Sequence, residues 1–214
     1  LHILHISTEK ELALFNNNIP LSNKLITSEC CIHHMWFNDQ DYQIKGSKIK
    51  WNPAVKSEKD RKALINAVNK NIIDVIATDH APHTEKEKMN KYLSAPSGGP
   101  LVQHALLALL EMEKTNQISL NQIVKKVSHD VANCFKIEKR GFLRPGYFAD
   151  IAIINPNKKV LVNKENLLYK CNWSPFEGTK FSCSIESTFV NGNRVYHNGS
   201  FNEKTNPMRL KFIR

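Results

Sequence analysis

The residues best suited to catalysis or metal binding follow directly after a segment of the sequence that is expected to be buried. Residues 72–77 are rich in apolar and β-branched side chains, which is typical of a strand covered on both faces. Asp79, His80 and His83 come next, and Pro82 prevents the strand from continuing. A carboxylate with imidazoles can bind a metal ion and move protons, and α/β barrels build their active sites at such strand ends. The alternative is an ordinary Asp-containing exit from a strand, and these residues alone do not decide between the two.

His5 occupies a similar position near the beginning of the chain. Residues 1–6 form an apolar segment, and Thr8 and Glu11 have the spacing of a capping box, which predicts a helix over residues 9–16. A strand, a histidine at its end and an immediate helix make the βα unit of a barrel or a doubly wound sheet. A single histidine in a strand is more often a hydrogen-bonded core residue than a ligand, so both interpretations of His5 stay open.

Strands and helices are expected to alternate along the first 135 residues or so. The loop at 80–100 is long and rich in Lys, Gly and Pro, and a loop of that length usually has a function. The expected strands are 1–6, 24–31 and 72–77, with an extended segment at 48–53, and the expected helices are 9–16, 57–69 with Ser57 as N-cap, 101–113, and one that begins at Ser119.

After Gly141 the pattern changes to short β-type runs separated by turn residues. Strands are expected at 151–154, 159–162, 187–190 and 194–196. The Asn191-Gly192 pair between the last two predicts a hairpin with a two-residue turn. This region is therefore expected to form a small β-domain.

The composition excludes several classes of function. The 214 residues, 41% of them hydrophobic, suffice for a sizeable core in one or two domains, and there is no run of about 18 apolar residues that could span a membrane. The net charge of +10 comes mostly from scattered lysines without the basic-aromatic alternation of nucleic-acid binding proteins. Five cysteines, without C-x-x-C spacing, indicate reduced thiols in a cytoplasmic protein. We expect neither a membrane nor a nucleic-acid partner.

Taken together, the motifs resemble dihydroorotase, a cyclic amidohydrolase of the amidohydrolase superfamily. Six segments follow the family's order and approximate spacing, from one end of the chain nearly to the other. The sequence departs from the family's usual Pro, Pro and Arg at Ile32, Ala54 and Lys56. These differences bear on how substrate is bound rather than on membership of the family. The matching segments are residues 5–8, 29–34, 52–64, 78–84 with Lys88, 95–100, and 146–151 with 174–178.

The resemblance implies the C-terminal part of a metal-dependent (β/α)8 barrel over residues 1–140 and a small β-sandwich-like domain over 141–214. It implies two divalent cations, zinc by preference, with His5 and Asp79 among the ligands and Asp79 as the catalytic general base and acid. It also implies substrate contacts from Asn52, His83, Ser97 and Gly98. The family's remaining metal ligands would lie upstream, so we expect this chain to be the C-terminal half of a longer protein and to be inactive alone.

The implied reaction is the reversible hydrolysis of L-dihydroorotate to N-carbamoyl-L-aspartate in pyrimidine synthesis, by an enzyme expected to be a homodimer. Another cyclic amidohydrolase, such as an allantoinase or dihydropyrimidinase, is one alternative. A non-catalytic dihydroorotase-like subunit that supports aspartate transcarbamoylase is another. Cys30, Cys31, His33 and His34 could form a different metal site, but adjacent cysteines on a strand point to opposite faces, which favours a structural role.

Overall fold

A three-stranded parallel sheet lies at the centre of the first part of the chain. The computed structural model describes residues 1–205 and 207–213. The strands are β1 (His2–Ile3), β2 (Thr27–Cys31) and β3 (Val75–Ala77), in the order β1-β2-β3. All three expected strands are present, although each is shorter than predicted. Because parallel strands end at the same edge of a sheet, the segments after β1 and β3, which carry His5 and Asp79, leave the sheet on the same side.

The two faces of β2 differ in chemistry. Cys30 belongs to the hydrophobic core, together with Leu64 and Val68. Glu29 lies on the opposite face because successive side chains of a strand alternate, and it contacts His2 of β1. Cys31 shares that face, so the two adjacent cysteines point to opposite sides as the sequence predicted.

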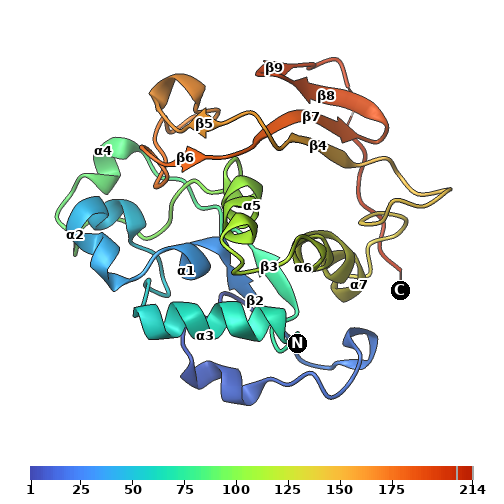
Figure 1. The fold of residues 1–214 in the computed structure, drawn as a ribbon, viewed down its shortest axis with the longest axis horizontal. Coiled ribbons are helices and arrows are strands. Elements are labelled where there is room, and N and C mark those ends of the chain that lie inside the picture. The colour runs from blue at the N-terminus through green and yellow to red at the C-terminus, as the bar shows by residue number, and fades with distance from the viewer. Residues whose placement is uncertain (206, 214) are drawn as a thin grey trace.

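Helices pack around this sheet (Figure 1). The predicted N-cap of α3 is confirmed, since the Ser57 hydroxyl accepts the Asp60 N–H at 3.2 Å. The cap at Ser119 is also confirmed, with the Gln122 N–H as donor at 3.2 Å. The helices are α1 (Ile32–Trp36), α2 (Tyr42–Lys45), α3 (Glu58–Asn69), α4 (Glu85–Lys88), α5 (Ala105–Lys114), α6 (Leu120–Val124) and α7 (Asp130–Cys134), with a π-helical turn, η5 (Lys125–His129), joining the last two.

Two local predictions need correction. The helix expected at 9–16 is only a 3-10 segment, η1 (Lys10–Leu14), although Thr8 and Glu11 do bond to each other as in a capping box. The segment expected to be extended at 48–53 begins with a 3-10 turn, η4 (Gly46–Ile49), since Gly46 adopts a φ of 52° that reverses the chain. The other 3-10 segments are η2 (Leu21–Asn23), η3 (Asp39–Asp41) and η6 (Lys164–Asn166).

An antiparallel sheet forms the other end of the molecule, at the top of Figure 1. It consists of β4 (Ile151–Asn155), β7 (Ser184–Val190), β8 (Asn193–His197) and β9 (Ser200–Phe201), in the order β4-β7-β8-β9. The predicted hairpin is confirmed, since Asn191 and Gly192 have φ values of 54° and 80° between β7 and β8. A separate pair, β5 (Val160–Leu161) and β6 (Lys180–Phe181), completes the region.

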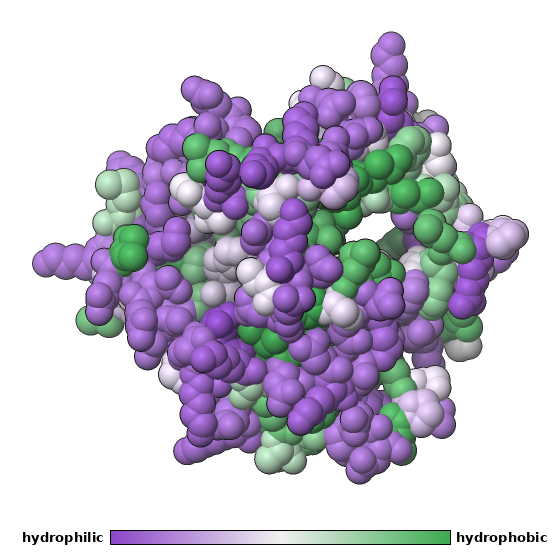
Figure 2. Space-filling view, in the orientation of Figure 1, coloured by the Kyte–Doolittle hydropathy of each residue, from purple (hydrophilic) through white to green (hydrophobic). Residues whose placement is uncertain are grey.

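The hydrophobic core extends through both regions. Val162, Phe176 and Phe181 belong to the same buried cluster as Leu107 and Met112 of α5. Within the described ranges, no helix combines the length and the apolar character that crossing a bilayer requires. Figure 2 shows a mainly hydrophilic face, with hydrophobic side chains gathered around a hollow between β4 and α6.

Candidate active site

His5 and Asp79 both leave the sheet in an unusual backbone conformation. Their φ angles are 40° and 47°, in the left-handed region that residues other than glycine rarely adopt. Such conformations persist where the surrounding structure fixes them, and they cluster at functional sites. Burial raises the pKa of the Asp79 carboxyl, whereas nearby His5 lowers it and Glu29 raises it. The two predicted metal ligands are therefore close enough to interact electrostatically.

Glu29 connects the end of β1 to β2. One oxygen of its carboxylate accepts the His5 N–H at 3.4 Å, and the other lies 3.1 Å from Nε2 of His2. Its backbone carbonyl accepts the Ile6 N–H at 2.8 Å. Three contacts from one residue thus hold the segment that carries His5.

The four predicted substrate residues lie on three segments that contact one another. Nε2 of His83 donates to the Ser97 carbonyl at 2.9 Å. The Gly98 N–H donates to the carbonyl of Lys50 at 2.9 Å, two residues before the exposed Asn52. That bond occupies the Gly98 N–H, so this amide is not free to donate to a ligand.

The loop that carries Ser97 and Gly98 also contacts the segment directly after Asp79. The Ala81 N–H donates to the Gly99 carbonyl at 3.2 Å, and Nδ1 of His80 accepts the Leu101 N–H at 3.0 Å. Gly98 has a φ of 113°, and a Cβ at this position would lie 2.5 Å from the Ala81 carbonyl oxygen. Only glycine fits there, so the close approach of the loop to the Asp79 segment depends on it.

Three residues near this loop were not predicted to have a role in the site. Trp51 and Trp173 flank Gly99, where an added Cβ would lie 2.7 Å from one ring and 3.2 Å from the other. Trp173 also donates its indole N–H to the His83 carbonyl at 2.7 Å. Lys88 is completely buried beside both rings. Lys88 belongs to a motif of the resemblance, but its residue type and position predicted no role for it, and no local pattern predicted the contacts of the three residues because these contacts join segments far apart in the chain.

His33 and His34 lie in the interior rather than at an open metal site. The His33 ring stacks on Trp51 with centroids 4.3 Å apart, and His34 Nε2 donates to the Pro53 carbonyl at 3.1 Å. Burial lowers the pKa of both imidazoles, to about 4 for His34. Burial also raises the pKa values of the Cys30 and Cys31 thiols, which disfavours the thiolate form that binds metals.

The donors at the strand ends fit a zinc site in kind. An imidazole from His5 and a carboxylate from Asp79 are suitable ligands, but zinc sites normally use three or four protein donors. No group of three or more His, Cys, Asp or Glu side chains is arranged to hold a metal within residues 1–205 and 207–213. These two residues thus fit as part of a metal site that needs further donors.

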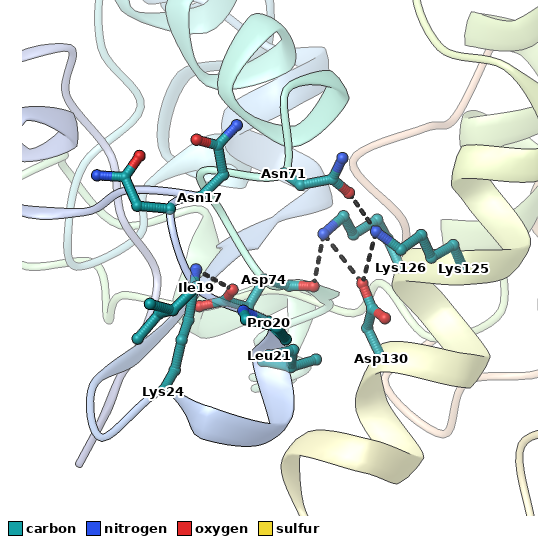
Figure 3. Close-up of a pocket in the computed structure, with 11 residues that line it drawn as sticks. Asn17, Ile19, Pro20, Leu21, Lys24, Asn71, Asp74, Lys125, Lys126 and Asp130 are labelled. Atoms are coloured by element: carbon teal, nitrogen blue, oxygen red, sulfur yellow. Dashed lines mark hydrogen bonds and ion pairs between the residues drawn. The ribbon is translucent and has the colours of Figure 1, made fainter.

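A separate cavity of about 440 Å³ lies at the opposite, amino end of the strands (Figure 3). Lys126 is buried and donates to the Asp74 carbonyl and to the Asp130 carboxylate, both at 3.0 Å. Lys24 binds the Asp74 carboxylate at 2.6 Å. Because Asp74 directly precedes β3, these ion pairs brace the end of the sheet that in barrels serves stability rather than catalysis.

The chain is similar to known proteins over most of its length. The sequence profile of the Amidohydrolase family matches residues 2–195. The dihydroorotase of Clostridium acetobutylicum is 33% identical over 196 residues, which cover 91% of this chain and 46% of that protein. The dihydroorotase of Methanosarcina acetivorans is 32% identical over 223 aligned residues, covering 99% of this chain and 46% of that protein. This chain therefore spans about half the length of the curated relatives it matches.

Solved structures share the fold at lower sequence identity. L-Hydantoinase (dihydropyrimidinase) from Arthrobacter aurescens superposes with a TM-score of 0.83 at 21% identity, over 94% of this chain and 46% of that one. Dihydropyrimidinase from Brevibacillus agri gives a TM-score of 0.79 at 22% identity, over 94% and 45%. The family profile, the relatives and the shared α/β fold agree: the chain belongs to the amidohydrolase family.

Proposed function

We propose that the protein is a dihydroorotase, which reversibly hydrolyses the cyclic amide of L-dihydroorotate to N-carbamoyl-L-aspartate in pyrimidine synthesis. The observation that carries the proposal is the pairing of His5 and Asp79, in strained conformations, at the same edge of the parallel sheet. The motif loop that contains Ser97 lies against the segment after Asp79. The dihydroorotase relatives support this substrate over other cyclic amides.

In the proposed mechanism Asp79 moves the protons. Its carboxylate takes a proton from the attacking water and returns it to the leaving amide nitrogen, so the residue is regenerated in each cycle. Burial raises its pKa, which makes the carboxylate a better base than one in water. Two divalent cations, zinc in our proposal, would polarise the scissile carbonyl when bound, with His5 and Asp79 among their ligands.

The substrate would lie between Asp79 and the loop of Ser97 and Gly98. His83 and Asn52 offer hydrogen-bond donors to the carboxylate and the ring edge of dihydroorotate. Ser97 offers its hydroxyl and N–H from the facing side. Gly98 would leave room for the substrate because it has no side chain. It would not donate to the substrate, since its N–H is already bonded to the Lys50 carbonyl.

We propose a two-domain architecture for the protein. Residues 1–140 would be the last strands and helices of a (β/α)8 barrel, and residues 141–214 a small β-sandwich-like domain. We further propose a cytoplasmic homodimer, with association with aspartate transcarbamoylase as an open alternative role.

A substrate panel distinguishes the candidate functions. The hydantoinase-like fold makes another cyclic amidohydrolase the second candidate. The intact gene product, loaded with zinc, should open the ring of dihydroorotate with a kcat/KM at least about 100-fold above those for dihydrouracil, hydantoin and allantoin. A discrimination of that size is expected of a site whose polar groups are left unpaired when the substrate carboxylate is absent. Preference for an uncharged ring would replace the proposal with the second candidate, and no turnover of any ring would favour a supporting subunit.

A further inference from the structure

Lys88 is the most completely enclosed cation on the substrate side of the proposed site. It has no exposed surface, and its ammonium donates to three backbone carbonyls: Lys50 at 3.1 Å, Pro96 at 2.9 Å and Gly98 at 2.7 Å. The indole rings of Trp51 and Trp173 lie 6.0 and 5.8 Å away. All three N–H donors and the positive charge therefore have partners, and none of these partners is a carboxylate.

Burying a lysine without a carboxylate is costly, so its position calls for an explanation other than stability. Burial, and the nearby charge of Lys50, lower the pKa of Lys88 to about 8. An apolar side chain would avoid the cost of burying the charge but would leave the Pro96 and Gly98 carbonyls without this donor, whereas the Lys50 carbonyl would keep the Gly98 N–H. The lysine thus fits a role in holding these carbonyls in one arrangement.

We propose that Lys88 is a positioning residue that shapes the substrate side of the active site. The proposal rests on the proposed function and deepens it. A trans peptide group directs its N–H opposite to its C=O, and the one cis bond among the described residues is Asn52–Pro53. With the Pro96 carbonyl held toward Lys88, the Ser97 N–H must point away from the lysine.

The same ammonium links the segments that carry the proposed substrate-binding residues. The Lys50 carbonyl that it binds also accepts the Gly98 N–H, and Lys50 leads directly into Trp51 and Asn52. Ser97 lies between Pro96 and Gly98, whose carbonyls Lys88 binds, and its own carbonyl accepts the His83 ring N–H. Lys88 therefore ties the segments of Asn52, Ser97 and His83 to one another without touching substrate itself.

Kinetics of the intact gene product test the role. Lys88→Met removes the donors while keeping an unbranched side chain only one heavy atom shorter, and Lys86→Met, on an exposed lysine of the same helix, is the control. Lys88→Met should raise the KM for dihydroorotate at least about tenfold, the effect of losing one hydrogen bond between the displaced loop and the substrate, with zinc content unchanged and kcat less affected. Lys86→Met should change the KM less than about twofold.

Hydrogen exchange provides a readout that does not need turnover. The amides of Ala81 and Gly98, which donate to the carbonyls of Gly99 and Lys50, should exchange at least about tenfold faster in Lys88→Met, while the amides of α3 keep their protection. If dihydroorotate is not a substrate at all, the proposed function fails, and this exchange experiment still decides whether Lys88 positions the loop.

Lys88→Gln serves as a second variant in case Lys88→Met does not fold. Glutamine keeps two N–H donors, so its KM and its loop exchange should lie between those of the parent and of Lys88→Met. Parental KM and parental loop exchange in either folded variant would overturn the proposal. Loss of α3 protection in both variants would also overturn it, because Lys88 would then be a requirement of the fold as a whole.

Discussion

At the residue scale, the backbone of His5 and Asp79 carries information that their side-chain types alone did not. The sequence placed both residues at strand ends, yet a lone strand histidine is more often structural. Their positive φ angles, and the contact of Glu29 with the His5 N–H, distinguish these strand ends from ordinary ones. Sequence patterns predict which residues end a strand, but φ strain and cross-strand contacts depend on the assembled sheet.

The division between metal ligands and substrate contacts can be tested one residue at a time. In the intact gene product, His5→Ala should lower zinc content and kcat together, because it removes a ligand. Asn52→Ala and His83→Ala should leave zinc content unchanged and raise the KM, lower kcat/KM, or both. Metal analysis beside steady-state kinetics makes the comparison. A loss of zinc from His83→Ala as large as that from His5→Ala would show that the assignment of His83 is wrong.

His104 predicts a pH dependence of stability. It is almost completely buried, with Nδ1 3.2 Å from the Ser174 hydroxyl, and burial lowers its pKa to about 4. The unfolded chain, with a histidine pKa near 6.5, then binds more protons between pH 6.5 and 4, so stability falls as pH falls through that range. The loss at pH 5 is about 2 kcal/mol.

Urea unfolding of the parent and of His104→Gln, from pH 4 to 8, isolates this contribution. Glutamine does not titrate, so the variant should lose less stability than the parent on going from pH 7 to pH 5. Equal slopes in the two proteins would mean that His104 is not held neutral by burial.

At the scale of elements, local signals predicted the capped helices and the turns best. Ser57, Ser119 and the Asn191-Gly192 turn act on neighbours within a few residues, and the structure confirms all three. The prediction at 9–16 was wrong in length, since a capping box specifies where a helix begins and not how far it continues. Strands β6 and β9 were missed because a two-residue strand is defined by its partner rather than by its own sequence.

The N-cap of α3 gives a prediction for a whole element. Ser57→Ala removes the acceptor for the Asp60 N–H and should lower the free energy of unfolding by about 1 kcal/mol. Ser94→Ala, at an exposed serine in a turn, is the control and should change it by less than about 0.5 kcal/mol. The measurement is the urea midpoint of the intact gene product. Equal midpoints for the two variants would show that the cap does not stabilise α3.

At the scale of the whole molecule, we propose that the parallel sheet is one part of a (β/α)8 barrel. We also propose that the metal site needs ligands in addition to His5 and Asp79. The parallel sheet has three strands, with β1 and β3 at its edges, and the segments of the two proposed metal donors leave it on the same side. The sequence could predict the family from ordered motifs. It included Lys88 in one of these motifs but could not predict that Lys88 is buried beside Trp51 and Trp173, since that burial depends on packing between distant segments.

Residues 1–214 by themselves should therefore not hydrolyse dihydroorotate. Zinc sites normally need three or four protein ligands, and closing a barrel of this kind takes about eight strands. The test is to purify this polypeptide, add zinc and follow ring opening against a protein-free control. Metal-dependent turnover above that control would mean that the 214 residues contain a complete site.

The most direct test of the central claim is the ring-opening rate of the intact gene product beside that of its Asp79→Asn variant. The amide is nearly isosteric with the carboxylate but cannot accept the proton, so the fold and much of the zinc should remain. The parent should turn over dihydroorotate, and kcat of the variant should fall by at least about 100-fold, as general-base catalysis is worth about 10² to 10⁴ in rate. A variant within about tenfold of the parent, at equal zinc content, would contradict the account.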